Sequence, residues 1–359
     1  MQIVVAKSST DPRWMKRNSE HSKLRAPTRI AKMSSADQAE LDRLLRQADQ
    51  LSAKVRQAFL DAVNALGDQV DVEQIKSLLE QGRVDQAIRT VDAQLTSQGF
   101  TPVAQAITGA AVDAARQTAR AVNALGEMNI SFGLTNPQTV DFLRTYEMGL
   151  IRAMSQDALA SVRGAIQAGV AAGRNPLDVA RDVRQFIGLT EGQTRAVLNY
   201  RNALQQGSRD ALSRGLRDRR FDSTVARAAR GDIALSDEQI DNMVSRYAAR
   251  YLKYRSETIA RTESIRSLNA GNHQLWNQAA ASGKVSANLI TRKWVTVGDH
   301  KVRASHAAIP GMNEGGVGLN VPFASPEGPI LYPGDPSASA AMTCNCRCAV
   351  IYRFSLPKT

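Results

Sequence analysis

The residues whose types could bind a metal ion gather near the end of the chain. They are Asp299, His300, His306 and the run TCNCRC at 343–348, which holds all three cysteines, and Trp294 lies shortly before them. If 344–348 is extended, Cys344, Cys346 and Cys348 share one face, and a disulfide between residues i and i+2 would be strained. Thiolates and an imidazole could instead hold a structural Zn²⁺. We predict His306, Cys346 and Cys348 as ligands, with Asp299 or Cys344 as a further candidate.

Two other interpretations of this cluster stay open. Cys-x-Cys with a distant histidine is less specific than the Cys-x-x-Cys spacing of structural zinc sites. The cysteines could be small buried residues of the last strand, with His306 hydrogen-bonded at a turn. A metal- or thiol-dependent enzyme or toxin using His306, Cys346 and Cys348 is the other alternative. However, the chain lacks the His-Glu-x-x-His, Gly-x-Ser-x-Gly and Gly-x-x-x-x-Gly-Lys motifs. We therefore expect no enzyme and assign no catalytic residue.

Basic residues form a second group of candidates, for contact with nucleic acid or an acidic protein. Arginines crowd the stretch 209–230, and a helical stripe follows in which cations lie beside Tyr247, Tyr251 and Tyr254. The candidates are Arg214, Arg217, Arg219, Arg220, Arg227, Arg230, Arg246, Arg250 and Lys253. For the stripe we favour tyrosines that face the core and cations that border it.

The elements that must position these residues are mainly helices. Apolar residues recur at three and four positions from Leu41 to Leu66, and Gly67 is a natural stop. Shorter patterns follow at 72–81 and 85–97, and the small-residue stretch from 108 to 126 could pack closely against a neighbour. Another long pattern lies between Pro137 and Gly173, with a break at Asn175-Pro176. Ser236 and Gln239 form a capping box for a long helix that ends between 269 and 282.

The composition changes after residue 282, and long helices are excluded between 310 and 336, where six of the 12 prolines and many glycines lie. The segments 291–297 and 346–354 have strand-like character and are predicted to pair in one small antiparallel sheet. We predict a basic N-terminal arm over 1–34, a helical body over 35–282 and a loop-rich C-terminal module over 283–359. The fold class is therefore mainly α with a small α+β C-terminal domain.

The overall composition limits the class of protein. A formal charge of +12 favours polyanionic partners, and three crowded cysteines argue against a secreted disulfide framework. The opening apolar stretch is too short for a signal sequence, and no apolar run approaches the ~18 residues of a membrane span. We expect a soluble protein in a reducing compartment, without a membrane span.

Several short motifs of the last third of the chain occur together in a fixed order. They are Glu257-Thr258-Ile259-Ala260-Arg261-Thr262-Glu263, Asn269-Ala270-Gly271-Asn272, Lys293-Trp294, His306, Gly311, Pro322-Phe323, Pro333-Gly334 and Asn345-Cys346-Arg347-Cys348. This ordered set, from about Arg255 to Phe354, resembles the Mu F-type minor head proteins of tailed phages. Cys344 is additional to the pair of cysteines usual in that family, and the resemblance does not extend to residues 1–200.

The resemblance implies a minor head (minor capsid) protein of the virion that associates with the portal and acts in head morphogenesis. It implies portal and other head proteins as partners, contact with packaged double-stranded DNA or ejection with it, and no established catalytic step. The expected location is the head interior or the portal vertex, after viral assembly in the bacterial host cytoplasm. A free nucleic-acid-binding protein outside any particle is a further hypothesis. The resemblance implies no cofactor, and the structural zinc considered above depends only on the residue types at 306 and 344–348.

Overall fold

The computed structural model describes residues 33–95, 97–126, 128–134 and 136–354. The predicted basic arm over 1–34 therefore lies outside the described residues, apart from its last two. The described chain is mainly helical, with a small antiparallel sheet near its C-terminal end, as the sequence predicts. None of the helices in this part of the chain is long and apolar enough to cross a membrane.

The first helices begin and end close to the positions that the sequence indicates. Helix α2 spans Ser35–Asp68 and is capped by Ser34, whose side chain accepts from the amide of Asp37. Its predicted apolar stripe is buried from Leu41 to Leu66. Helices α3 (Val72–Glu80), α4 (Val84–Gln94) and α5 (Thr101–Asn123) follow. The patterns at 72–81 and 85–97 are thus confirmed as two short helices.

The middle of the chain contributes helices that start at asparagine and threonine caps. Helix α6 spans Pro137–Ala171 and α7 spans Pro176–Phe186, each with an asparagine N-cap followed by proline at the first helical position. Helix α8 (Glu191–Gln205) starts with a capping box, and α9 (Asp222–Ala229) comes after the 3-10 turns Arg209–Ser213 and Arg219–Phe221.

Helix α10 is the longest helix of the described chain, and it carries the predicted cations near its start and leads into the C-terminal module at its end. It spans Asp237–Ala281, begins with the predicted Ser236–Gln239 capping box and is about 67 Å long at 1.5 Å per residue. It packs against α2 and α5. A Cβ atom at Gly271 would lie 2.1 Å from the Ala111 carbonyl oxygen, so glycine permits the close approach to α5. This is the close packing expected of the small-residue stretch.

The sheet forms after α10. Strand β1 (Ile290–Val295) is central, and β2 (Val317–Gly318) and β3 (Ala349–Phe354) pair with it on either side, both antiparallel. Two short helices, α11 (Ala304–Met312) and α12 (Ala340–Thr343), lie in the intervening loops. The pairing of 291–297 with 346–354 is confirmed, but β3 starts only at Ala349. Residues 344–348 are therefore not a strand, because Asn345 has a φ of 54° and turns the backbone.

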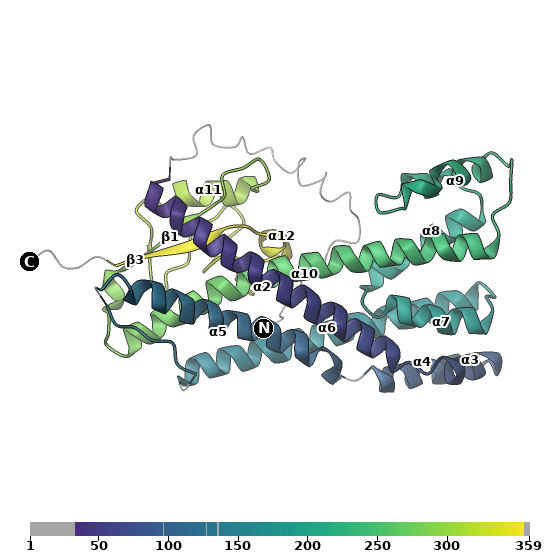
Figure 1. Ribbon diagram of the computed structural model, residues 1–359, viewed down its shortest axis with the longest axis horizontal. Coiled ribbons are helices and arrows are strands. Elements are labelled where there is room, and N and C mark those ends of the chain that lie inside the picture. Colours follow the sequence, from purple (N-terminus) through teal and green to yellow (C-terminus); the bar gives the residue numbers. More distant parts are fainter. Residues whose placement is uncertain (1–32, 96, 127, 135, 355–359) are drawn as a thin grey trace, which may run out of the picture.

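The C-terminal module is joined to the helices by a common core. One cluster contains Leu41 and Leu44 of α2, Ile265 and Leu268 of α10, and residues of β1 and β3. In Figure 1 the sheet with α11 lies near one end of α10, whereas α8 and α9 lie at the other. The predicted domain boundary at 282 stays a prediction, since this hydrophobic core includes residues from both sides of it.

Candidate metal-binding cluster and arginine-rich tip

Three metal-ligating side chains converge in the C-terminal module. Nδ1 of His306 lies 3.5 Å from Sγ of Cys346 and 3.4 Å from Sγ of Cys348. The ligand atoms of these residues all lie within 4.8 Å of one another, and all three side chains are buried. Within the described ranges, no other group of three or more histidine, cysteine or acidic side chains has such geometry.

The cluster is positioned by α11 on one side and by the turn before β3 on the other. The amide of Asn345 donates to the Thr262 hydroxyl (2.9 Å), and Arg261 donates to the Asn345 side chain (3.1 Å). Arg303, at the start of α11, donates to the carbonyl of Cys344. These contacts fix the turn against α10, and Cys346 and Cys348 then point toward His306.

The surroundings of the two thiols make them unequal. The hydrogen bond from Cys348 lowers the pKa of Cys346, although burial opposes this effect. The same bond and burial raise the pKa of Cys348. The amide of Cys348 also donates to Sγ of Cys346 at 3.4 Å. Trp294 of β1 also borders the cluster, since its ring and the His306 ring are arranged edge to face with centroids 5.6 Å apart.

Cys344, Asp299 and His300 are not part of this cluster. Cys344 is buried separately, and its burial raises the pKa of the thiol to about 11. Asp299 forms two hydrogen bonds with the guanidinium of Arg347 (2.6 and 2.8 Å), which lowers the pKa of the carboxyl to about 2. His300 is exposed. The prediction that alternate cysteines share a face thus fails at Cys344, because the left-handed turn at Asn345 interrupts the alternation.

A buried ionic group joins α10 to α6 and to the proline-glycine loop, and sequence reasoning did not identify it as a site. Glu263 accepts two hydrogen bonds from Arg266 (3.0 and 3.1 Å) and one from the Tyr146 hydroxyl. Arg266 also donates to the carbonyl of Gly334 at 2.6 Å. Burial and the neighbouring Glu263 raise the pKa of Tyr146. Glu263 and Gly334, which belong to two separate motifs of the sequence, therefore meet in one structural contact through Arg266.

A cleft of about 550 Å³ opens beside this group and is lined partly by His273, Tyr332 and Asp335. Desolvation by burial lowers the pKa of His273 to about 4, so its imidazole is neutral at neutral pH. Its Nδ1 lies 3.4 Å from the hydroxyl of Tyr352. The sequence alone did not distinguish this buried histidine from the others.

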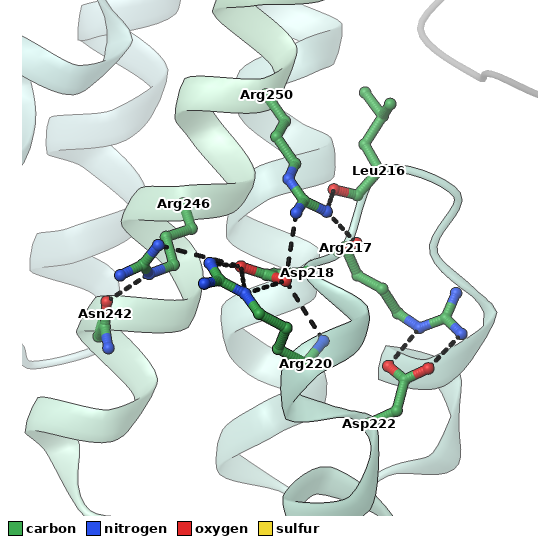
Figure 2. A network of polar contacts seen from close by, with 8 residues as sticks. All are labelled: Leu216, Arg217, Asp218, Arg220, Asp222, Asn242, Arg246 and Arg250. Carbon is green, nitrogen blue, oxygen red and sulfur yellow. Dashed lines mark hydrogen bonds and ion pairs between the residues drawn. The ribbon is translucent and has the colours of Figure 1, made fainter.

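The other end of α10 carries the predicted arginines. We call residues 208–232 and 237–254 together the arginine-rich tip. Figure 2 shows that Asp218 lies at its centre, with Arg220 (2.6 Å), Arg250 (3.2 Å) and Arg246 (4.0 Å) around the carboxylate. The Arg220 hydrogen bonds hold the pKa of Asp218 well below its usual value. Arg217 forms a bidentate pair with Asp222 (2.8 and 2.9 Å).

The nine predicted basic residues thus fall into different environments. Five form ion pairs with carboxylates of the same chain, namely Arg217, Arg220, Arg230, Arg246 and Arg250. Arg214 is half-buried, and its Nε has no hydrogen-bond partner among the described residues. Arg219, Arg227 and Lys253 are exposed, and no ion pair within this part of the chain includes them. Tyr247 and Tyr251 are buried in a core with Tyr200, which agrees with the favoured interpretation of the stripe, whereas Tyr254 is only half-buried.

Comparison with known proteins identifies the family of this chain. The family model described as Phage Mu protein F like protein matches residues 160–351, which include both the arginine-rich tip and the metal-type cluster. The match also covers residues 160–200, so the expectation that the resemblance does not reach residues 1–200 is wrong for this segment. The chain belongs to this family and is thereby a phage head-morphogenesis protein. No curated protein and no solved structure matches the chain.

Proposed function

We propose that this protein is a minor structural component of the phage head that associates with the portal and contacts packaged DNA. The observation that carries the proposal is the family match over residues 160–351. Long helices offer extended faces to neighbouring head proteins, and the net charge of +12 favours a polyanion. The proposed location is the head interior or the portal vertex, after assembly in the host cytoplasm. The family favours this role over a metal- or thiol-dependent enzyme.

Mass spectrometry of purified particles tests the assembly role. We expect the chain in mature virions at a copy number comparable to that of the portal, and crosslinks between the two. Comparison of particles before and after DNA release separates a resident protein from one that is ejected. Virions that contain none of this chain would contradict the proposal.

The exposed cations of the arginine-rich tip are the proposed DNA contacts. Arg219, Arg227 and Lys253 are not engaged by carboxylates of the described chain, and Arg220 keeps 70% of its side chain exposed despite its ion pair. Each phosphate that a cation neutralises releases counterions, so real contacts weaken with salt. Tyr247 and Tyr251 are buried and cannot stack on bases, which favours contacts to phosphates.

A salt titration of DNA binding tests this surface. Replacing Arg219, Arg227 and Lys253 together by alanine is expected to reduce the slope of log affinity against log salt by roughly 2 to 3. In the matched control, alanine replaces Lys284, Lys293 and Lys301, which are three exposed cations of the C-terminal region. Equal slopes for the two triple variants, or no binding by the parent protein at low salt, would exclude the tip as a DNA contact.

We also propose that the protein acts by binding, without a catalytic step. Substrate turnover by the purified chain that His306→Ala abolishes, with the fold intact, would instead support the enzyme alternative.

A further inference from the structure

The ligand atoms of His306, Cys346 and Cys348 converge on one position between them. Both sulfur atoms lie near the same nitrogen, Nδ1 of His306. In the tautomer of neutral imidazole that leaves Nδ1 unprotonated, this atom has one lone pair and accepts one good hydrogen bond, so two thiols cannot both donate to it well. A cation between the three atoms would use one lone pair from each.

The two nitrogen–sulfur distances match the dimensions of a zinc site. Zinc lies at about 2.3 Å from a thiolate sulfur and about 2.0 to 2.1 Å from an imidazole nitrogen, so a tetrahedral angle puts these two ligands ~3.5 Å apart. The two distances from Nδ1 to sulfur are 3.5 and 3.4 Å. Thiolates and imidazole favour Zn²⁺ over Mg²⁺ or Ca²⁺, which prefer oxygen ligands.

We propose that His306 Nδ1, Cys346 Sγ and Cys348 Sγ bind one Zn²⁺ that has a structural role. The ion would join α11 to the turn before β3 and close the segment 307–345, which contains six prolines and little regular structure. Two thiolates neutralise the charge of the ion, so the buried site carries no net charge. The amide of Cys348 that donates to the Cys346 sulfur stabilises the thiolate.

The fourth ligand is a water molecule in this proposal, which keeps the site without net charge. A small cleft of about 10 Å³ lies against the cluster, lined also by Lys301, Val302 and Arg303. This volume is at the lower limit of the roughly 10 to 15 Å³ that one water molecule needs. Cys344 is excluded from the ligand set because its sulfur lies outside the group of mutually close ligand atoms.

Metal analysis of the purified full-length chain tests the site. After dialysis against buffered Zn²⁺ and then metal-free buffer, we expect one zinc per chain by elemental and native mass spectrometry. His306→Ala, Cys346→Ser and Cys348→Ser are each expected to lose at least tenfold in zinc affinity. Cys344→Ser and His300→Ala are matched controls, since each removes the same type of group from outside the cluster, and both should retain the metal.

A spectroscopic measurement distinguishes lost coordination from lost folding. Co²⁺ in the parent protein is expected to show thiolate charge-transfer absorption and the visible bands of a tetrahedral site. These are lost or weakened in Cys346→Ser, while its helical circular dichroism stays within roughly 10% of the parent value because the helical core lies mostly outside the module.

Three results would overturn the proposal. They are a parent protein without stoichiometric zinc, zinc content unchanged by all three ligand substitutions, or loss of zinc in Cys344→Ser as large as in Cys346→Ser. Preference for another metal under competition would overturn the assignment to zinc. The outcome is independent of whether the chain is found in virions or binds DNA, so the two proposals can fail separately.

Discussion

Arginine residues have different environments at the two ends of α10. In the C-terminal region, Arg266 is buried against Glu263, and Arg292 of β1 is buried with its guanidinium directed at the carbonyls of Gly318, Val321 and Leu331. In the arginine-rich tip, by contrast, Arg220 and Arg246 surround Asp218 at the surface (Figure 2). The same residue type therefore stabilises the fold at one end and leaves exposed positive charge at the other.

The comparison shows why a count of arginines does not locate a binding surface. A buried guanidinium cannot contact another molecule. A guanidinium that is paired with a carboxylate of its own chain attracts a second anion less strongly, because the carboxylate offsets part of its positive charge. Arg266 and Arg227 both lie in helical sequence, so their local sequence does not distinguish them. They differ in burial and in whether they form an ion pair. The following substitutions test this difference, starting with the largest expected effect.

Arg266→Ala should have the largest effect on stability. It leaves the Glu263 carboxylate buried without its ion pair and removes the bond to the Gly334 carbonyl. We expect the free energy of unfolding to fall by about 3 to 5 kcal/mol, measured by urea denaturation. A loss below about 1 kcal/mol would show that the buried pair does not stabilise the C-terminal region.

Acid should destabilise the C-terminal region through His273. Its folded pKa of about 4 lies below the ordinary value of 6.5, so between these values the unfolded chain binds the proton and the folded chain does not. Stability should therefore fall as the pH falls from about 6.5 to 4. We expect the parent protein to lose roughly 2 to 3 kcal/mol more than His273→Gln between pH 7.5 and 4.5. Parallel pH profiles of the two proteins would contradict this expectation.

Gly271→Ala tests the contact between α10 and α5. The added methyl group would overlap the Ala111 carbonyl, and we expect a loss of about 1 to 3 kcal/mol in thermal or urea unfolding. Gly109→Ala in α5 is the control, because a Cβ atom there meets nothing within 4 Å. The control should be neutral or stabilising by up to about 1 kcal/mol, since alanine favours the helix. Similar losses of stability in both variants would mean that the close approach of α10 to α5 at Gly271 does not account for the effect.

Arg227→Ala should have the smallest effect. The residue is exposed, and no ion pair of the described chain includes it. We expect the free energy of unfolding to change by less than about 0.5 kcal/mol in the same urea experiment. A large destabilisation would mean that the tip arginines are structural, as Arg266 is, and would weaken the proposal that they serve a partner.

Local patterns in the sequence determined the long helices, several of their caps and two of the three strands. The Ser236–Gln239 capping box, the prolines after Asn136 and Asn175, and the strand-like segments at 291–297 and 346–354 depend on neighbours within a few residues, so they can be predicted without the fold. The sequence also identified His306, Cys346 and Cys348 as residues of one chemical type.

Tertiary structure decided which of these residues meet. A turn at Asn345 separates Cys344 from the other cysteines, and Asp218 recruits Arg246 and Arg250 from a different element. Glu263, Arg266 and Gly334 come together only after α10 packs against the proline-glycine loop. Such contacts join residues tens of positions apart, and their distances depend on the packing of whole elements, which periodicity and spacing do not encode.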